Sequence, residues 1–177
     1  MRATGRHLVF WLFILVVSCQ GTRAQMPVPG GEEGSVSLEA LQPHGYVNDF
    51  AGVIDLPNRQ KLEKYCGDLA RRTGAQLAVV TIVSLNGEPL EHAATSLFNR
   101  WGIGQKGKNN GVMLLLAIED RKSRLEVGYG LESTIPNDDA KAILDAMIPS
   151  MRAGRYGEAL VQASAAIGKR VSAGAGK

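Results

Sequence analysis

Apolar residues recur along the chain with spacings that predict helices alternating with buried strands. Leu62, Cys66 and Leu69 follow one another at the i, i+4 and i+7 positions of one helix face. Pro57 suits the first turn of that helix, and Gly74 suits its end. These residues predict an amphipathic helix that ends at Gly74.

Two apolar runs predict strands that are buried on both faces. The first is QLAVVTIVSL, from Gln76 to Leu85, and the second runs from Val112 to Ile118. The next segment, SRLEV from Ser123 to Val127, alternates polar and apolar residues after a short turn. We therefore expect it to pair antiparallel to the second run.

Further helices are expected over residues 89–100, 137–152 and 155–171, where apolar residues again recur at helical spacing. Helices that alternate with buried strands predict an α/β fold, a Rossmann-like three-layer α/β/α sandwich around a mixed sheet. Ligands of such folds bind where loops leave the strand ends, so candidate functional residues are sought in the loops.

The first residues of the chain have the pattern of an export signal. A basic start, Met1–Arg6, precedes an eleven-residue apolar run, Leu8–Ser18, which is too short to span a bilayer. The pattern predicts a signal peptide over residues 1–24. An alternative is cleavage after residue 18 with acyl chains on Cys19, because the preceding Val-Val-Ser resembles a bacterial lipobox.

The remaining chain divides into a tether and one domain. Residues 25–45 are rich in Pro, Gly, Glu and Ser and predict a flexible tether. The domain is expected over residues 46–173, with a short tail over 174–177. The protein is thus expected to be periplasmic or otherwise associated with the cell envelope, and to contact a membrane only through a lipid anchor on Cys19.

Composition agrees with one globular domain and argues against nucleic-acid binding. The 177 residues are 45% hydrophobic and 21% charged. The net charge is +3, but Arg2, Arg6 and Arg23 lie in the predicted leader, so the mature chain is nearly neutral. Basic residues are not interleaved with aromatic ones, as a base-stacking surface requires.

Acidic residues at the edges of predicted elements are candidate metal ligands. They are Asp49, Asp120, Glu132, Asp138 and Asp139. Asp138 and Asp139 also suit a helix start, where carboxylates complement the dipole, and that reading stays open. If the five converge, their oxygens suit calcium, whereas zinc would need His and Cys ligands.

A glycine-punctuated loop, WGIGQKGKNNG, follows the helix expected over 89–100. Its backbone N–H groups could cradle a phosphate, with Lys106, Lys108 and Arg121 supplying positive charge. The spacing fits neither a Walker loop nor a dinucleotide fingerprint, and a strand follows in place of a helix. A structural turn is therefore the favoured interpretation.

No nucleophile motif is present in the sequence. There is no Gly-x-Ser-x-Gly elbow and no catalytic cysteine signature, and Cys66 lies on the apolar face of a predicted helix, as a core thiol would. The chemistry that remains is metal-assisted phosphate hydrolysis, for which Asp120 and Arg121 are the candidate catalytic residues.

Several segments taken together resemble the TPM domain family. They are Tyr46–Ile54 (YVNDFAGVI), QLAVVTIVSL, FNRWGIG, NNGV, EDRK and VGYGLE, in that order. Trp101, Gly102, Gly104, Asn110 and Gly111 match what looks like the central signature of the family. The five acids fall on what look like its acidic positions.

The resemblance implies an α/β/α sandwich, a calcium site in loops and, as in a thylakoid-lumen acid phosphatase linked to photosystem repair, weak phosphatase activity in some members. We expect a calcium-binding module of the envelope that takes part in protein interaction, assembly or repair, with an envelope or membrane protein as partner. The alternative is a low-efficiency, metal-assisted acid phosphatase acting on phosphomonoesters.

Overall fold

The computed structural model describes residues 37–174, which form a four-stranded mixed sheet with helices on both faces. The strands are β1 (Val47–Asp49), β2 (Gln76–Ile82), β3 (Gly111–Ala117) and β4 (Lys122–Val127), in that spatial order. β1, β2 and β3 are parallel, and β4 is antiparallel to β3. The expected α/β fold with a mixed sheet is confirmed.

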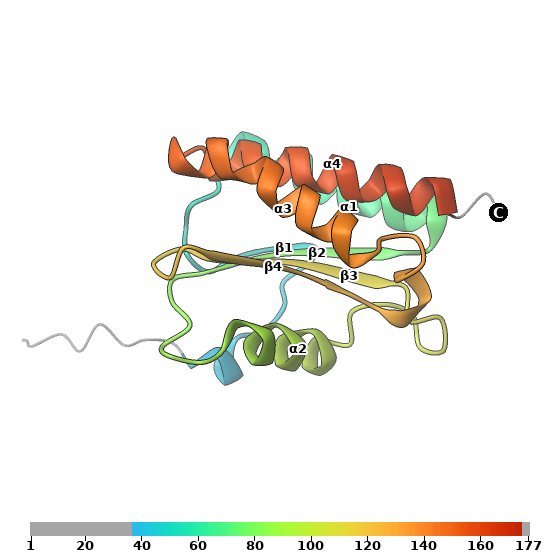
Figure 1. Ribbon diagram of the computed structural model, residues 1–177, viewed down its shortest axis with the longest axis horizontal. Helices are drawn as coiled ribbons and strands as arrows, with labels where there is room; N and C mark the ends of the chain where they lie inside the picture. Colours follow the sequence, from blue (N-terminus) through green and yellow to red (C-terminus); the bar gives the residue numbers. More distant parts are fainter. Residues whose placement is uncertain (1–36, 175–177) are drawn as a thin grey trace, which may run out of the picture. The chain divides into compact units, whose positions relative to one another are not determined.

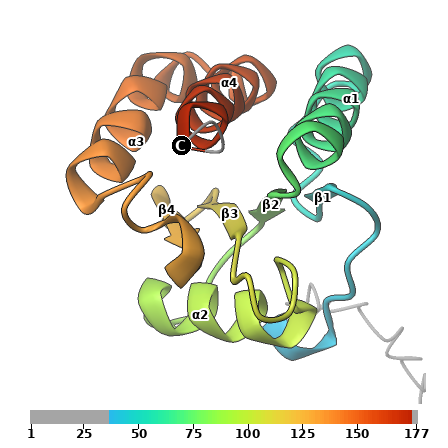
Figure 2. The same ribbon diagram turned by 90° about the vertical axis from the view of Figure 1, so that its right-hand side faces the viewer.

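Three helices cover one face of the sheet and one helix covers the other (Figures 1 and 2). The first set is α1 (Leu56–Thr73), α3 (Asn137–Arg152) and α4 (Tyr156–Gly174). Opposite them lie α2 (Leu90–Trp101) and a short 3-10 helix, η1 (Leu38–Ala40); a second 3-10 helix, η2 (Tyr129–Leu131), follows β4. The expected helices and the antiparallel pairing of β4 are confirmed, with ends displaced by a few residues.

The two parallel crossovers have opposite hands. The chain steps the same way across the sheet from β1 to β2 and from β2 to β3, yet α1 and α2 lie on opposite faces (Figure 2). One of the two connections must therefore be left-handed, a hand that is rare in parallel sheets.

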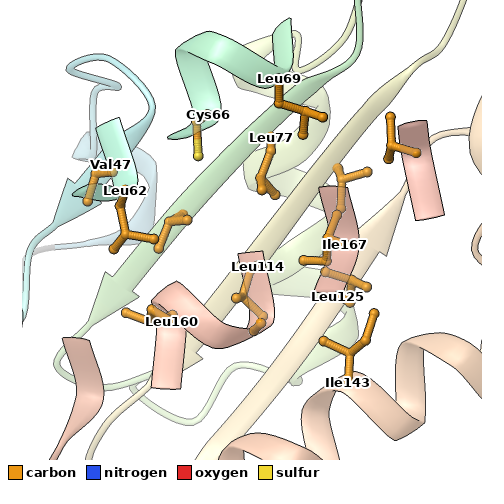
Figure 3. Packing of buried hydrophobic residues seen from close by; sticks show 14 of the residues in the cluster. Val47, Leu62, Cys66, Leu69, Leu77, Leu114, Leu125, Ile143, Leu160 and Ile167 are labelled. Atoms are coloured by element: carbon orange, nitrogen blue, oxygen red, sulfur yellow. The ribbon is translucent and has the colours of Figure 1, made fainter. Parts of the chain in front are cut away.

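The core is split into two layers by the sheet, as the period of two along a strand requires. Leu77 and Val79 of β2 pack toward α1 and α4, in the layer of Figure 3, while Ala78 and Val80 pack toward α2. Every residue of β3 is buried, because strands flank it on both sides and helices cover both faces. This burial on both faces is the reason for the long apolar runs in the sequence.

The expected tether is wrong for its last part. Leu38 and Leu41 are 8% and 5% exposed and belong to the core layer under α2. The Trp101 indole N–H donates to the Leu41 carbonyl, and the Arg100 guanidinium donates to that of Leu38. The composition of residues 25–45 is polar overall, so it gave no sign that Leu38 and Leu41 are spaced to cover one apolar surface.

Strand β1 was not expected from the sequence, because three residues are too few for a periodic signal. The expected signal peptide, the lipidation candidate Cys19 and the final residues 175–177 lie outside the described residues. Within residues 37–174, no helix has both the length and the hydropathy needed to cross a membrane.

Candidate functional site

The edge of the sheet where β1, β2 and β3 end is called here the carboxyl edge, and a groove with a volume of about 560 Å³ opens there at the end of β3. It lies between the β3–β4 turn and the corner that joins α3 to α4. The cationic residues Arg121, Lys122 and Arg152 line it, and we call it the basic groove. Its position agrees with the rule that ligands of open α/β sheets bind beyond the carboxyl ends of the strands.

The three cations of the basic groove carry uncompensated charge. None of them forms an ion pair with any other residue in the described part of the chain. By contrast, Arg124, two residues further along β4, is bound to Glu126 at 2.7 Å. Helix α4 begins at Tyr156 and α3 ends at Arg152, so a positive and a negative helix end both lie at the groove and the side-chain cations decide its charge.

Apolar side chains form the rest of the groove. Ile118 comes from the end of β3, and Ile148 and Met151 come from the last turns of α3. Ile148 is 37% exposed and is one of only four large hydrophobic residues that are exposed in residues 37–174. The groove therefore combines positive charge with an accessible apolar wall.

Tight turns bring these residues together. Arg121 adopts a φ of 54°, and its backbone N–H donates to the Ile118 carbonyl at 3.2 Å, which reverses the chain so that Lys122 pairs with Ala117. At the other wall, Gly154 has a φ of 72°, a left-handed conformation that turns the chain from α3 into α4.

The expected convergence of five acidic side chains is wrong. Asp49 ends β1 and Asp120 follows β3, so both lie at the carboxyl edge. Glu132, Asp138 and Asp139 follow the end of β4 at the opposite edge, which we call the amino edge. The reason is that β4 is antiparallel and returns the chain across the whole sheet.

Asp49 and Asp120 hold loops in place. The Asp49 carboxylate accepts the backbone N–H groups of Val53 and Ile54 at 3.1 and 3.0 Å, and the Thr81 hydroxyl donates to it at 2.5 Å. The Asp120 carboxylate accepts the N–H of Leu85 at 2.8 Å and is not among the groove residues. Of the two candidate catalytic residues, Asp120 therefore contacts the Leu85 backbone, whereas Arg121 lines the basic groove.

The three acids of the amino edge do not form a ligand set either. Glu132 and Asp138 are exposed, and Asp139 is bound to Arg170. Within the described ranges no group of three or more His, Cys, Asp or Glu residues is placed to hold a metal ion. The five acids thus do not fit one calcium site, and calcium binding stays a prediction that can involve acids of one edge only.

The glycine-punctuated loop lies at the amino edge, away from the basic groove. A Cβ on Gly111 would lie 2.2 Å from the Ile103 carbonyl oxygen, and one on Gly104 would lie 2.7 Å from the Gly111 nitrogen. The Asn110 side chain accepts from the Gln105 N–H and donates to the Gly74 carbonyl. These contacts bring backbones close together and favour the structural-turn interpretation of the loop.

The signature residues Trp101 and Gly102 belong to the same region. Gly102 ends α2 in a left-handed conformation, with a φ of 60°, and Trp101 holds the η1 segment through its indole N–H. Neither lines the basic groove.

The thiol of Cys66 is fully buried between α1 and the sheet (Figure 3). Burial, and secondarily the charge of Glu63, raises the pKa of Cys66 to about 12. A thiol that cannot ionise near neutral pH is a poor nucleophile, which agrees with the expected core role.

Sequence reasoning missed part of the groove. Arg121 was named as a candidate catalytic residue and as one possible charge for a phosphate, but Ile148, Met151, Arg152 and Tyr156 were not singled out. The spacing of Ile148 and Arg152, four residues apart on one helix face, is a usable signal only once the neighbouring turn is known.

Comparison with known proteins gives a family and a fold. The family model described as the TPM domain matches residues 47–170. The solution NMR structure of the N-terminal domain of a protein from P. gingivalis is 30% identical, has a TM-score of 0.67, and is matched over 79% of this chain and 85% of that chain. None of the curated proteins compared with this chain matches it significantly.

Two more distant structures are similar in fold. The N-terminal domain of the cg2496 protein from Corynebacterium glutamicum is 16% identical, with a TM-score of 0.57 over 73% of this chain and 84% of that chain. The BA42 protein from the psychrophilic bacterium Bizionia argentinensis is 15% identical, with a TM-score of 0.59 over 68% of this chain and 82% of that chain.

Proposed function

Because the chain belongs to the TPM domain family, we propose that it is an exported binding module of the cell envelope that holds an anionic group in the basic groove. One observation carries this proposal. Arg121, Lys122 and Arg152 line the same cavity and have no acidic partner among the described residues. Clustered positive charge in a cleft raises the local concentration of anions and stabilises them once bound.

A phosphate group is the probe that suits this arrangement. Arginine matches phosphate oxygens with two donors at once, and lysine adds a point charge. The partner in the cell is then a molecule of the envelope that presents such a group.

The direct test is calorimetric titration of the purified protein with inorganic phosphate at low ionic strength. Arg152→Gln and Lys122→Gln should each weaken binding several-fold, since each removes one charge without affecting the core. Lys108→Gln is the matched control, because Lys108 is exposed on the loop at the amino edge. Binding that is equal in all three variants and the parent protein would contradict the proposal.

The phosphatase alternative has less support. Hydrolysis needs a residue that activates water beside the bound phosphate, and Asp120 is turned to the Leu85 N–H. Its test is hydrolysis of a generic phosphomonoester before and after Asp120→Asn. Activity that persists through purification and drops with this substitution would favour the enzyme over the binding module.

Calcium and export are further parts of the proposal. Calcium binding to the folded protein should raise its melting temperature, so a thermal melt with calcium and with chelator tests it. Export rests on the predicted signal peptide over residues 1–24, or on Cys19 as a lipid anchor. Mass spectrometry of the mature N-terminus distinguishes the two.

A further inference from the structure

The basic groove has an apolar wall that a bare anion would leave in contact with water. Ile118, Ile148 and Met151 line the groove together with its cations. Ile148 is 37% exposed although most other isoleucines of the domain are in the core. An apolar side chain in an open groove gains free energy only when a ligand covers it.

The apolar wall lies directly beside the charges. Ile148 and Arg152 are four residues apart on α3, so their side chains are neighbours on one helix face, one turn apart. On the facing wall, Ile118 precedes Arg121 across the tight turn of the hairpin. A ligand whose charged group meets Arg152 can therefore reach Ile148 and Met151 with its adjacent atoms.

The volume limits the size of the ligand. A groove of about 560 Å³ falls in the range of sites that hold one small molecule. This fits one short chain or one ring better than the two long chains of a membrane phospholipid.

We propose, resting on the proposed function, that the ligand of the basic groove is a small anionic amphiphile. Its phosphate or carboxylate group contacts Arg121, Lys122 and Arg152, and its short apolar chain or ring lies against Ile148 and Met151. The contribution of the apolar part is what distinguishes this ligand from free phosphate.

The test compares two phosphate monoesters of similar charge, hexyl phosphate and glycerol 3-phosphate, by calorimetry at concentrations where hexyl phosphate stays monomeric. Hexyl phosphate should bind at least about tenfold more tightly, since its chain covers the apolar wall. Ile148→Asn should remove most of that preference, because it replaces the apolar surface that only the hexyl chain covers. Arg152→Gln should weaken the binding of both ligands.

Matched controls come from the amino edge. Tyr129 is 82% exposed, so Tyr129→Ser also removes an exposed apolar side chain, and it should leave the affinity for both ligands unchanged. Far-UV circular dichroism of each variant verifies that it is folded. Ile148 and Arg152 are both exposed, and replacing them does not touch the core.

The outcomes separate the two proposals. If both esters bind with equal affinity, or if Ile148→Asn keeps the preference for hexyl phosphate, the proposal of an amphiphilic ligand is wrong. The proposed anion-binding function then stands. If neither ester nor inorganic phosphate binds, the proposed function fails as well. Binding only to vesicles of phosphatidylcholine with phosphatidic acid, with no binding of hexyl phosphate, would replace the small amphiphile with a membrane surface.

Discussion

The guanidinium of Arg170 donates two hydrogen bonds to the carboxylate of Asp139, from Nε to Oδ2 at 2.8 Å and from Nη2 to Oδ1 at 3.1 Å. The pair joins the last turns of α4 to the first turn of α3. These hydrogen bonds hold the pKa of Asp139 below its ordinary value of 3.8. A carboxylate that was a candidate metal ligand in the sequence is thus part of an interhelical ion pair.

This pair should contribute a small, pH-dependent stabilisation. Because the pKa of Asp139 is lower in the folded than in the unfolded chain, the contribution is present above pH 3.8 and is lost as the pH falls through the folded pKa. Asp139→Asn should therefore lower the melting temperature slightly near neutral pH, since both partners are partly exposed. Below the pKa of Asp139 in the folded chain, the melting curves of the parent protein and of Asp139→Asn should converge. Asp138→Asn, at the adjacent exposed position, is the matched control.

Asp49→Ala should destabilise the fold by about 2 kcal/mol, because it removes the acceptor for two backbone N–H groups and for the Thr81 hydroxyl. Thr81 is fully buried, and its hydroxyl loses the acceptor to which it donates. Denaturant unfolding measures the loss, and Glu132→Ala, an exposed carboxylate, is the control. The loss should be the same with and without chelator. A loss that appears only with calcium present would assign Asp49 to a metal site instead.

Gly111→Ala should cost about 3 kcal/mol or prevent folding, since the new Cβ would lie 2.2 Å from the Ile103 carbonyl oxygen. Gly107→Ala tests a glycine with a left-handed backbone but no steric contact at the added Cβ. Gly107 has a φ of 82° but nothing within 4 Å of the added Cβ, so only backbone strain of about 1 kcal/mol is expected. Urea unfolding of both variants decides whether steric contact or conformation is the larger cost. Equal losses would mean that the loop can move away from β3.

Cys66 should resist thiol reagents in the folded protein, because its side chain is fully buried and its pKa is raised to about 12. Mass spectrometry of the peptide that carries Cys66 after exposure to a maleimide measures this, and the same reaction in denaturant supplies the control. Rapid labelling under native conditions would show that α1 separates from the sheet.

Ser164→Ala should raise stability by about 1 kcal/mol. In the part of the chain that the structure describes, the Ser164 hydroxyl is the one buried side-chain group without a hydrogen-bond partner. Alanine removes that unpaired group and favours the helix. Thermal and urea unfolding of the variant give the difference, and a loss of stability would mean that the hydroxyl has a partner such as a buried water.

The regular elements could be predicted because each is defined by local spacing. Gln76–Ile82 and Gly111–Ala117 are apolar runs in the sequence and buried strands in the structure. The packing of Leu38 and Leu41 could not be predicted, because their partners on α2 lie far away in the sequence. The short β1 gives no periodic signal, and only its pairing with β2 makes it a strand.

The arrangement of the candidate metal ligands could not be predicted from local patterns in the sequence. The antiparallel pairing of β4 follows from the short turn that joins it to β3, and that pairing carries Glu132 and Asp138 away from Asp49 and Asp120. Candidate ligands were chosen by their positions at element ends, which is a property of the sequence. Whether those ends meet depends on the direction of each strand in the sheet.

The sequence by itself determined the fold class and the order of the four long helices and of β2, β3 and β4, because periodicity and turn residues act over short distances along the chain. Its ordered segments also determined the membership of the TPM domain family. Only the tertiary structure decided that Arg121 and Lys122 share a groove with Arg152 and an apolar wall. The β3–β4 turn and the α3–α4 corner are about thirty residues apart, and packing of the helices on the sheet is what brings them together.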